Sequence, residues 1–299
     1  MELSLLMRLR IAASVATGVI LIGVLAWPIA ASSLPLKAVL AADIGVGGLI
    51  TLVVLSFLTG LIAYFVSWPH GREIGILAVP SGLTIWAVRS GSMDTLLQLN
   101  PTIEQRQSIY SSFILDCTFW LVLVAVGFVG VLLAQKIMSG SHKTFKRRKP
   151  DSKSVEYLSA IIALAGTVFI TQFCIKMFAQ DISIADDRLG SVISQPSIGQ
   201  IVFAVFISFG FAAFIVKKFL DVSYIWPAIA TVFLTIFITN SYVREDVLQY
   251  FVQQWPTSFF VNSVISILPI QLVAFGSLGS VAGYWMAVRY SYWHKHEMK

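Results

Sequence analysis

Charged residues are scarce in this 299-residue chain: Asp, Glu, Lys and Arg together make up 12% of it, whereas 57% is hydrophobic and the mean hydropathy is +0.81. A soluble domain of this length has no interior large enough to hide so much apolar surface. The scarcity of charge therefore excludes an ordinary soluble globular protein, and it indicates an integral membrane protein.

Cysteine and histidine are also scarce, and their scarcity argues against several kinds of site. Cys117 and Cys174 lie inside apolar runs, without the spacing of a metal site or a disulfide framework. His294 and His296 have no third ligand beside them. No grouping of serine, histidine and acid suggests hydrolysis, and no stretch reads as a phosphate-binding loop. We therefore assign no catalytic residue, cofactor or metal.

Long hydrophobic runs are what the chain has in abundance. Because a helix rises about 1.5 Å per residue, about 20 apolar residues cross the roughly 30 Å hydrocarbon core of a bilayer. Seven such runs are present, at residues 11–31, 44–68, 113–137, 157–178, 198–216, 224–241 and 259–288. Tryptophans such as Trp27 and Trp68 sit near their ends, as is usual at membrane interfaces. The last run contains Pro269, at which we expect a kink.

One further apolar stretch, residues 74–88, is short for a span, since its 15 residues reach only about 22 Å as a helix. Pro80, Ser81 and Gly82 interrupt its centre. A short crossing helix and a re-entrant hairpin both fit this pattern. The choice matters because it decides which side of the membrane Arg8 and Arg10 face.

A basic segment fixes the orientation. Residues 139–153 hold six Lys and Arg residues against the single acid Asp151, namely Lys143, Lys146, Arg147, Arg148, Lys149 and Lys153. Short loops this rich in positive charge stay in the cytoplasm. The basic C-terminal tail then also lies in the cytoplasm, four crossings further on. If residues 74–88 also cross, Arg8 and Arg10 lie on the cytoplasmic side too, and more positive charge lies inside than in the seven-span alternative.

The predicted fold is therefore an all-α, polytopic membrane bundle of about eight transmembrane helices. Residues 1–138 form the first membrane half, with helices 1–4 and the short third helix at 74–88. Residues 139–155 form a basic cytoplasmic loop, and residues 156–299 form the second half, with helices 5–8 and a short basic tail. We expect a bacterial-type inner membrane and cytoplasmic N- and C-termini. The basic start and the small residues after the first run also fit a cleaved signal peptide, so that alternative stays open.

Polar side chains inside predicted spans are candidates for transport or proton relay, because they are costly there. Four residues qualify: Asp116, Gln172, Lys176 and Gln271. Hydrogen bonding between helices explains the same residues without transport.

Small residues four apart mark candidate helix-packing positions, either within the chain or in a homo-oligomer. They are Ser56 with Gly60 and Gly279 with Gly283. Candidate contacts for anionic lipid headgroups are Lys146, Arg147, Arg148 and Lys149, in the basic part of residues 143–149. That segment has one aromatic residue and no folded domain around it, so we expect no nucleic-acid partner.

Two segments on the predicted outer side have some structure of their own. In residues 243–258, Val247, Phe251 and Trp255 share one face, which is typical of a helix lying at the membrane interface. Asn100 before Pro101 suggests a cap and the first residue of a helix leading into the next span. These segments either bind partners or cover the ends of the bundle.

The sequence predicts a class of protein and leaves its specific role open. We expect a non-enzymatic structural or assembly component that acts through partner proteins. A small-solute or ion transporter is the alternative, and an intramembrane enzyme is the third. A polar cavity lined by Asp116, Gln172 or Gln271 would favour transport, whereas a filled bundle would favour assembly.

Overall fold

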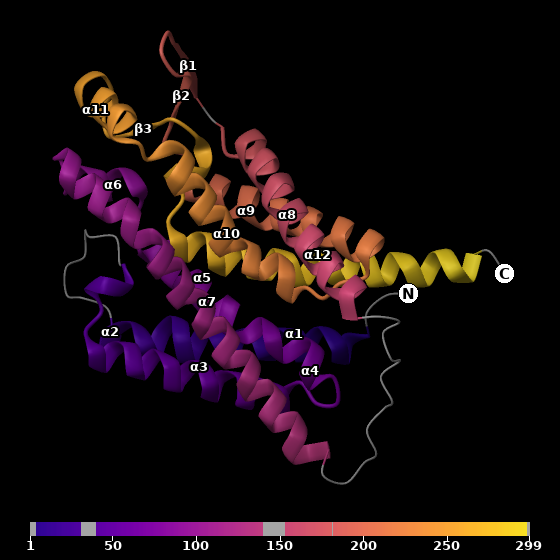
Figure 1. The fold of residues 1–299 in the computed structure, drawn as a ribbon. Helices are drawn as coiled ribbons and strands as arrows, with labels where there is room; N and C mark the ends of the chain where they lie inside the picture. The colour runs from indigo at the N-terminus through magenta and orange to yellow at the C-terminus, as the bar shows by residue number, and fades with distance from the viewer. Residues whose placement is uncertain (1–3, 31–39, 140–152, 181, 298–299) are drawn as a thin grey trace. The chain divides into compact units, whose positions relative to one another are not determined.

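The computed structural model describes residues 4–30, 40–139, 153–180 and 182–297 (Figure 1). Contacts divide the chain into two compact units, which we call unit 1 and unit 2. Unit 1 comprises Met1–Ser33, Val39–Arg89 and Phe119–Ser152, and unit 2 comprises Leu34–Ala38, Ser90–Thr118 and Lys153–Lys299. The units differ from the two halves on either side of the basic segment, because Ser90–Thr118 packs with unit 2.

Helices make up most of both units. Unit 1 contains α1 (Leu5–Gly18), α2 (Ala26–Ala30), α3 (Val46–Val66), α4 (Gly71–Ile74), α5 (Ala78–Arg89) and the second part of α7 (Ile103–Ser139). A π-helix, Val19–Leu25, joins α1 to α2, and a 3-10 turn, Gly75–Leu77, joins α4 to α5. Unit 2 contains α6 (Met93–Gln98), the first part of α7, α8 (Lys153–Phe178), α9 (Ile198–Leu220), α10 (Ile225–Tyr242), α11 (Glu245–Gln254) and α12 (Pro269–Glu297).

Six of the described helices are long and apolar enough to span a membrane: Leu5–Ala30, Val46–Val66, Ile103–Met138, Tyr157–Phe178, Ile198–Leu220 and Pro269–His294. The seventh candidate is the pair α10 and α11, which is bent by 75°. Every one of the seven predicted spans coincides at least in part with one of these candidates. The predicted all-α membrane bundle is thus confirmed.

The start of α7 differs from the prediction. The helix begins at Ile103, ten residues before the predicted boundary at 113, because Thr102 and Gln105 form a capping box. The Gln105 N–H donates to Thr102 Oγ1 (3.3 Å), and the Thr102 N–H donates to Gln105 Oε1 (3.2 Å). The predicted cap at Asn100 is wrong, since its side chain donates instead to the Leu96 carbonyl at the end of α6 (2.9 Å).

The last predicted span, 259–288, starts too early. Strand β3 (Phe259–Phe260) and a 3-10 turn (Ser263–Ser266) precede α12, which begins at Pro269. The predicted kink at Pro269 is wrong. Pro269 is the first residue of α12, and an N–H at that position has no partner within the helix, so its absence disturbs nothing. The helix start is completed by Gln271, whose Oε1 accepts a hydrogen bond from the Leu268 N–H (3.0 Å).

Residues 74–88 form one continuous helical run with a 3-10 turn before Pro80, and not a hairpin. This run lies along α1 and its π-helix in the same direction. Ser14 Oγ donates to the Ile74 carbonyl (3.2 Å) at one end, and Trp86 Nε1 donates to the Ile22 carbonyl (2.7 Å) at the other.

Helices α3 and α7 also share a direction. A Cβ added at Gly60 would lie 1.9 Å from the Gly127 carbonyl oxygen, and Tyr64, one turn further along α3, packs with Val131, one turn further along α7. Since α3 and α7 run the same way, the chain must return between them.

Contacts between α5 and α7 show which segment makes that return. A Cβ added at Gly75 would meet the Val131 side chain at 3.2 Å, whereas Trp86, near the other end of α5, lies 5.8 Å from the Trp120 ring. The two helices are therefore antiparallel. Unit 1 is an alternating bundle in which α1 and α5 run one way and α3 and α7 the other.

In unit 2, α9 and α12 pack side by side in the same direction. A Cβ added at Gly279 would lie 2.3 Å from the Phe206 carbonyl oxygen, and one at Gly283 would lie 1.9 Å from that of Gly210. Backbones approach this closely where one helix has glycine at the contact, since any Cβ there would collide with the backbone of the other helix. Helix α10 connects the end of α9 to α11 and α12, so it returns the chain.

A small sheet in unit 2 has the order β1 (Ser183–Asp186), β2 (Gly190–Ser194), β3, with antiparallel neighbours. This sheet is not among the elements predicted from the sequence. Gly190 closes the β1–β2 hairpin at φ 77°, a left-handed conformation that glycine adopts without steric cost.

Candidate functional site

The elements of unit 2 that join its long helices gather at one end, which we call the cap. It consists of α6, the first turns of α7, the β1–β2 hairpin, α11, β3 and the turn before α12; Figure 1 shows the hairpin, β3 and α11 together. These segments come from three separate stretches of the chain. Two polar residues tie them together.

Asp186 anchors α11 to the hairpin. Its Oδ2 accepts hydrogen bonds from the Tyr250 hydroxyl (2.8 Å) and from Trp255 Nε1 (2.9 Å), and its Oδ1 accepts the N–H groups of Arg188 and Leu189 (3.0 and 2.8 Å). Desolvation raises the pKa of this carboxyl, but the four hydrogen bonds together outweigh it and lower the pKa from its ordinary value.

Gln195 joins three further segments. Its Oε1 accepts the Asp94 N–H at the start of α6 (3.3 Å), its Nε2 donates to the Ser266 carbonyl (3.2 Å), and its backbone N–H donates to the Ser258 carbonyl (2.7 Å). The cap is therefore a folded assembly held by specific polar contacts.

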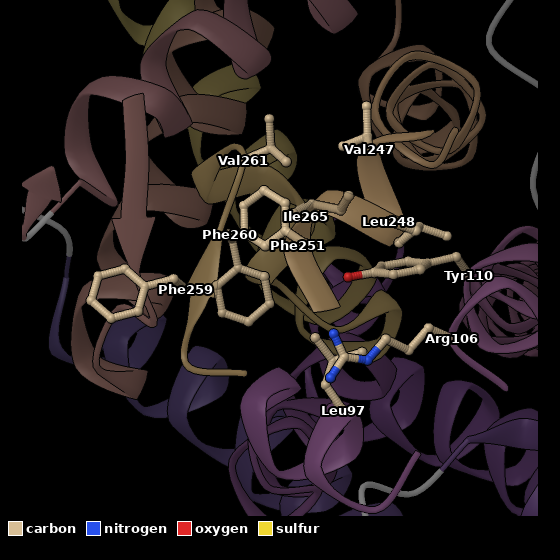
Figure 2. Close-up of a pocket in the computed structure, with 10 residues that line it drawn as sticks. All are labelled: Leu97, Arg106, Tyr110, Val247, Leu248, Phe251, Phe259, Phe260, Val261 and Ile265. Carbon is tan, nitrogen blue, oxygen red and sulfur yellow. The ribbon is translucent and has the colours of Figure 1, made fainter. Parts of the chain in front are cut away.

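A small pocket, open to solvent, lies inside the cap, and the volume that the centre of a water molecule can occupy in it is about 20 Å³ (Figure 2). Its walls are apolar apart from Arg106 and Tyr110, and the remaining lining residues are Leu97, Val247, Leu248, Phe251, Phe259, Phe260, Val261 and Ile265. In Figure 2 the guanidinium of Arg106 and the hydroxyl of Tyr110 both point toward the space beside Phe260. The cavity thus combines one cation and one hydroxyl with a hydrocarbon-like surface.

Arg106 is buried, with 6% of its surface exposed. Its Nε donates to the Asn100 carbonyl (3.2 Å), which uses one of the five N–H donors of the guanidinium. Within the described residues no carboxylate forms an ion pair with it. A buried cation without a counter-charge is unusual, because burial of a charge is costly unless it is paired.

A second small pocket, also of about 20 Å³ and open to solvent, adjoins the first and shares Tyr110 and Ile265 with it. Its lining adds Phe113, Thr235, Ile238, Thr239, Val264, Ile267, Pro269 and Leu272. Arg106, Tyr110 and Phe113 are spaced by four and three residues, so they follow one face of α7 from the cap toward its apolar part. We call the two adjoining cavities the furrow.

The four predicted intramembrane polar residues all belong to unit 2, but they occupy different environments. Asp116 is buried on α7, Gln172 is partly buried on α8, and Lys176 is exposed near the end of α8. Gln271 is buried and caps α12, and its Nε2 donates to the Gly91 carbonyl (3.4 Å).

The predicted packing residues lie in contacts within the units. Ser56 and Gly60 face Gly127 on α7, and Gly279 and Gly283 face α9. Of the other candidates, Lys146, Arg147, Arg148 and Lys149 lie outside the described residues. Among the residues that the structure describes, no three His, Cys, Asp or Glu side chains are placed to hold a metal ion.

Sequence reasoning missed the residues that distinguish the cap. Arg106 lies in a polar stretch on the predicted outer side, where a positive charge is ordinary, and no motif in the sequence singles out Asp186. The spacing of Arg106, Tyr110 and Phe113 was a usable signal, because it puts a cation in line with an apolar face. Ile182 and Ile184, two residues apart, and the turn-forming residues Asp186, Asp187 and Gly190 after them were the signal for the hairpin.

Together, the long apolar helices and their packing define an all-α, multi-pass membrane protein with a folded cap at one end of unit 2. Comparison with known proteins finds no match, since no family model, no curated protein and no solved structure aligns with the chain.

Proposed function

We propose that this protein is a non-enzymatic membrane component that crosses the bilayer eight times and acts on partner proteins through its cap. The observation that carries the partner role is β1, the edge strand of the cap's small sheet. Ile184 in this strand and Ile182 just before it are 39% and 55% exposed, and Asp186 holds the strand against α11. An exposed strand edge offers unpaired N–H and C=O groups to an extended partner segment.

The eight-span threading draws support from unit 1. Because α5 runs with α1 and against α7, residues 71–89 are the only described helical segment between α3 and α7 that can return the chain. The threading with residues 139–153 in the cytoplasm then puts all three connecting stretches of the cap on the outer side. Their meeting at one end of unit 2 agrees with that assignment.

The opposite end of unit 2 is basic and aromatic, which supports a cytoplasmic location for it. Lys218 Nζ lies 4.4 Å from the centre of the Tyr290 ring, and Arg289 lies 4.7 Å from the Trp293 ring. Cations and amphipathic rings are both favoured at the membrane surface, and Lys and Arg are favoured on its inner side. On this basis we propose a plasma-type inner membrane with both termini in the cytoplasm.

Cysteine labelling in intact cells tests the threading. In a background without Cys117 and Cys174, we expect Asp187→Cys in the hairpin turn to react with an impermeant maleimide. We expect His70→Cys, in the α3–α4 connection, to be protected until the cells are opened. Labelling of both positions from outside would support seven crossings, and labelling of His70→Cys alone would invert the map.

Site-specific photocrosslinking tests the partner role. A benzophenone amino acid at Ile184 is expected to give one adduct of reproducible mass in intact cells, and the Asp186→Asn background should weaken it because the strand loses its anchor. The matched control is Phe173 on α8, which is 66% exposed on a long apolar helix and should give lipid adducts only. Equal protein adducts at both positions, or none at Ile184, would contradict the proposal.

A further inference from the structure

The buried cation in the furrow suggests a ligand that supplies the missing negative charge. Only 6% of the Arg106 side chain is exposed, and a single hydrogen bond to the Asn100 carbonyl does not neutralise its positive charge. The planar guanidinium matches a carboxylate or a phosphate with two parallel hydrogen bonds. Tyr110 adds a hydroxyl donor one helical turn away. An anionic head therefore fits the polar end of the furrow.

The other residues that line the furrow are mostly apolar, so they favour a hydrocarbon chain as the second part of the ligand. Leu248, Phe251 and Phe260 surround the first cavity, and the second continues with Phe113, Ile238 and Leu272. A free inorganic anion would leave this apolar surface in contact with water, whereas a hydrocarbon chain would cover it. The distance along α7 from Arg106 to Phe113 is about 10 Å, enough for the first part of such a chain.

We infer that the furrow binds a single-headed anionic amphiphile, with its carboxylate or phosphate on Arg106 and Tyr110 and its chain running along α7 toward Phe113. This ligand is a lipid-type molecule, so the inference goes beyond the proposed partner role and does not depend on it. The head lies at the cap, where a molecule from the bilayer enters without its charge crossing the hydrocarbon core. A free fatty acid and a phosphate-headed lipid share this chemistry.

Photolabelling of the purified full-length protein in a nonionic detergent tests the inference. The probe is hexadecanoic acid with a diazirine on its chain, and we expect its adducts in peptides covering residues 97–113 and 247–272. Hexadecanoate and hexadecyl phosphate should compete for labelling. Hexadecanol and inorganic phosphate should compete about tenfold less well, because each lacks one half of the recognised chemistry.

Substitutions test whether Arg106 and Tyr110 bind the head of the probe. Arg106→Gln is expected to weaken probe binding by about tenfold or more, and Tyr110→Phe by several-fold, since each removes a hydrogen-bond donor to the head. The matched control is Arg244→Gln, an exposed cation of the same cap, which should bind as the unsubstituted protein does. If Arg106→Gln does not give a monodisperse folded protein, Tyr110→Phe and Ile265→Trp, which fills the boundary between the two cavities, replace it.

Each result decides the question. Adducts at other peptides, equal competition by hexadecanol, or full-affinity binding by folded Arg106→Gln would overturn the inference. Extraction of the molecules that copurify with the protein distinguishes the two sources of the ligand. A free fatty acid or a phosphate-headed lipid that is retained by the unsubstituted protein and lost from Arg106→Gln supports it.

Discussion

Units 1 and 2 differ in the contacts that hold their helices and loops together. In unit 1, helices touch backbone to backbone at several places; a Cβ added at Gly18 would lie 1.7 Å from the Ala78 carbonyl oxygen, and one at Gly60 would lie 1.9 Å from that of Gly127. Unit 2 uses this device between α9 and α12, but its cap is held by polar side chains and contains the furrow. Glycine contacts leave no space between two helices, whereas the packed loops and the amphipathic helix of the cap leave small pockets open to solvent.

Two arginines near the predicted outer surface show the same contrast. Arg89 at the end of α5 in unit 1 is exposed, lies over the Trp27 ring at 5.4 Å and reaches the Gly23 carbonyl (3.5 Å). Its charge is solvated, and it anchors a helix end. Arg106 in unit 2 is buried in an apolar cavity. We infer a ligand only for the second arginine, because no ion pair among the described residues compensates its buried charge.

The largest expected effect breaks the glycine contacts. Gly60→Ala would drive a methyl group into the Gly127 backbone, so α3 and α7 must separate, and we expect a loss of about 3 kcal/mol of stability. Melting of the purified protein, followed by size-exclusion chromatography after heating, measures the change.

Gly47→Ala on the same helix is the matched control, because nothing lies within 4 Å of the added Cβ. It should be neutral or stabilise α3 by up to about 1 kcal/mol, the difference in helix propensity between alanine and glycine. Equal melting of the two variants would show that the close approach in unit 1 is not required.

A smaller and more local effect is expected in the cap. Asp186→Asn keeps the shape of the side chain but removes the charge that strengthens its hydrogen bonds to Tyr250 and Trp255. Amides of α11 should then exchange with deuterium several-fold faster, while those of α9 and α12 are unchanged. Faster exchange throughout unit 2 would mean that the cap is not a separate local assembly.

Acid should reproduce this effect in the unsubstituted protein. Because the folded-state pKa of Asp186 is lowered, its contribution to cap stability is fully present above the ordinary value of 3.8 and is lost as the pH falls through the lowered pKa. The exchange of α11 should therefore differ from that of Asp186→Asn at pH 6, and it should approach that of Asp186→Asn only when the pH falls below the lowered pKa. A difference that persists in strong acid would assign the anchoring to another group.

The long helices of both units could be predicted from the sequence, but their exact ends could not. The seven long runs became helices because a run of about 20 apolar residues has few alternatives in a bilayer. Boundaries depended on individual side chains: Thr102 and Gln105 moved the start of α7 outward, and Pro269 moved the start of α12 inward. A hydropathy pattern does not register such caps, since a cap is a local hydrogen bond and not a change in polarity.

The candidate site was harder to predict for a different reason. Asp116 and Lys176 drew attention because they are charged inside apolar runs, whereas Arg106 lies in a polar stretch where a charge is ordinary. Its burial comes from α11 and β3, more than 140 residues further along the chain. Only tertiary packing of the cap turns a surface arginine into a buried one.

The smallest expected effect concerns Gln271, which sequence reasoning placed among the transport candidates. Gln271→Met keeps the length and volume but leaves the Leu268 N–H without its acceptor and the Gly91 carbonyl without its donor. Loss of such a cap costs about 1 kcal/mol, so the melting temperature should fall slightly.

Gln172→Met on α8 is the control, since that side chain is only partly buried and should tolerate the change. If the role of Gln271 is structural, Gln271→Met loses stability but still gives the photolabelling of the furrow. The reason is that the Gln271 side chain stabilises the start of α12 and does not contact the ligand head. If Gln271→Met melted at the same temperature as the unsubstituted protein but was no longer photolabelled, Gln271 would contact the ligand. The furrow would then include the start of α12, and Gln271 would not be only a structural residue.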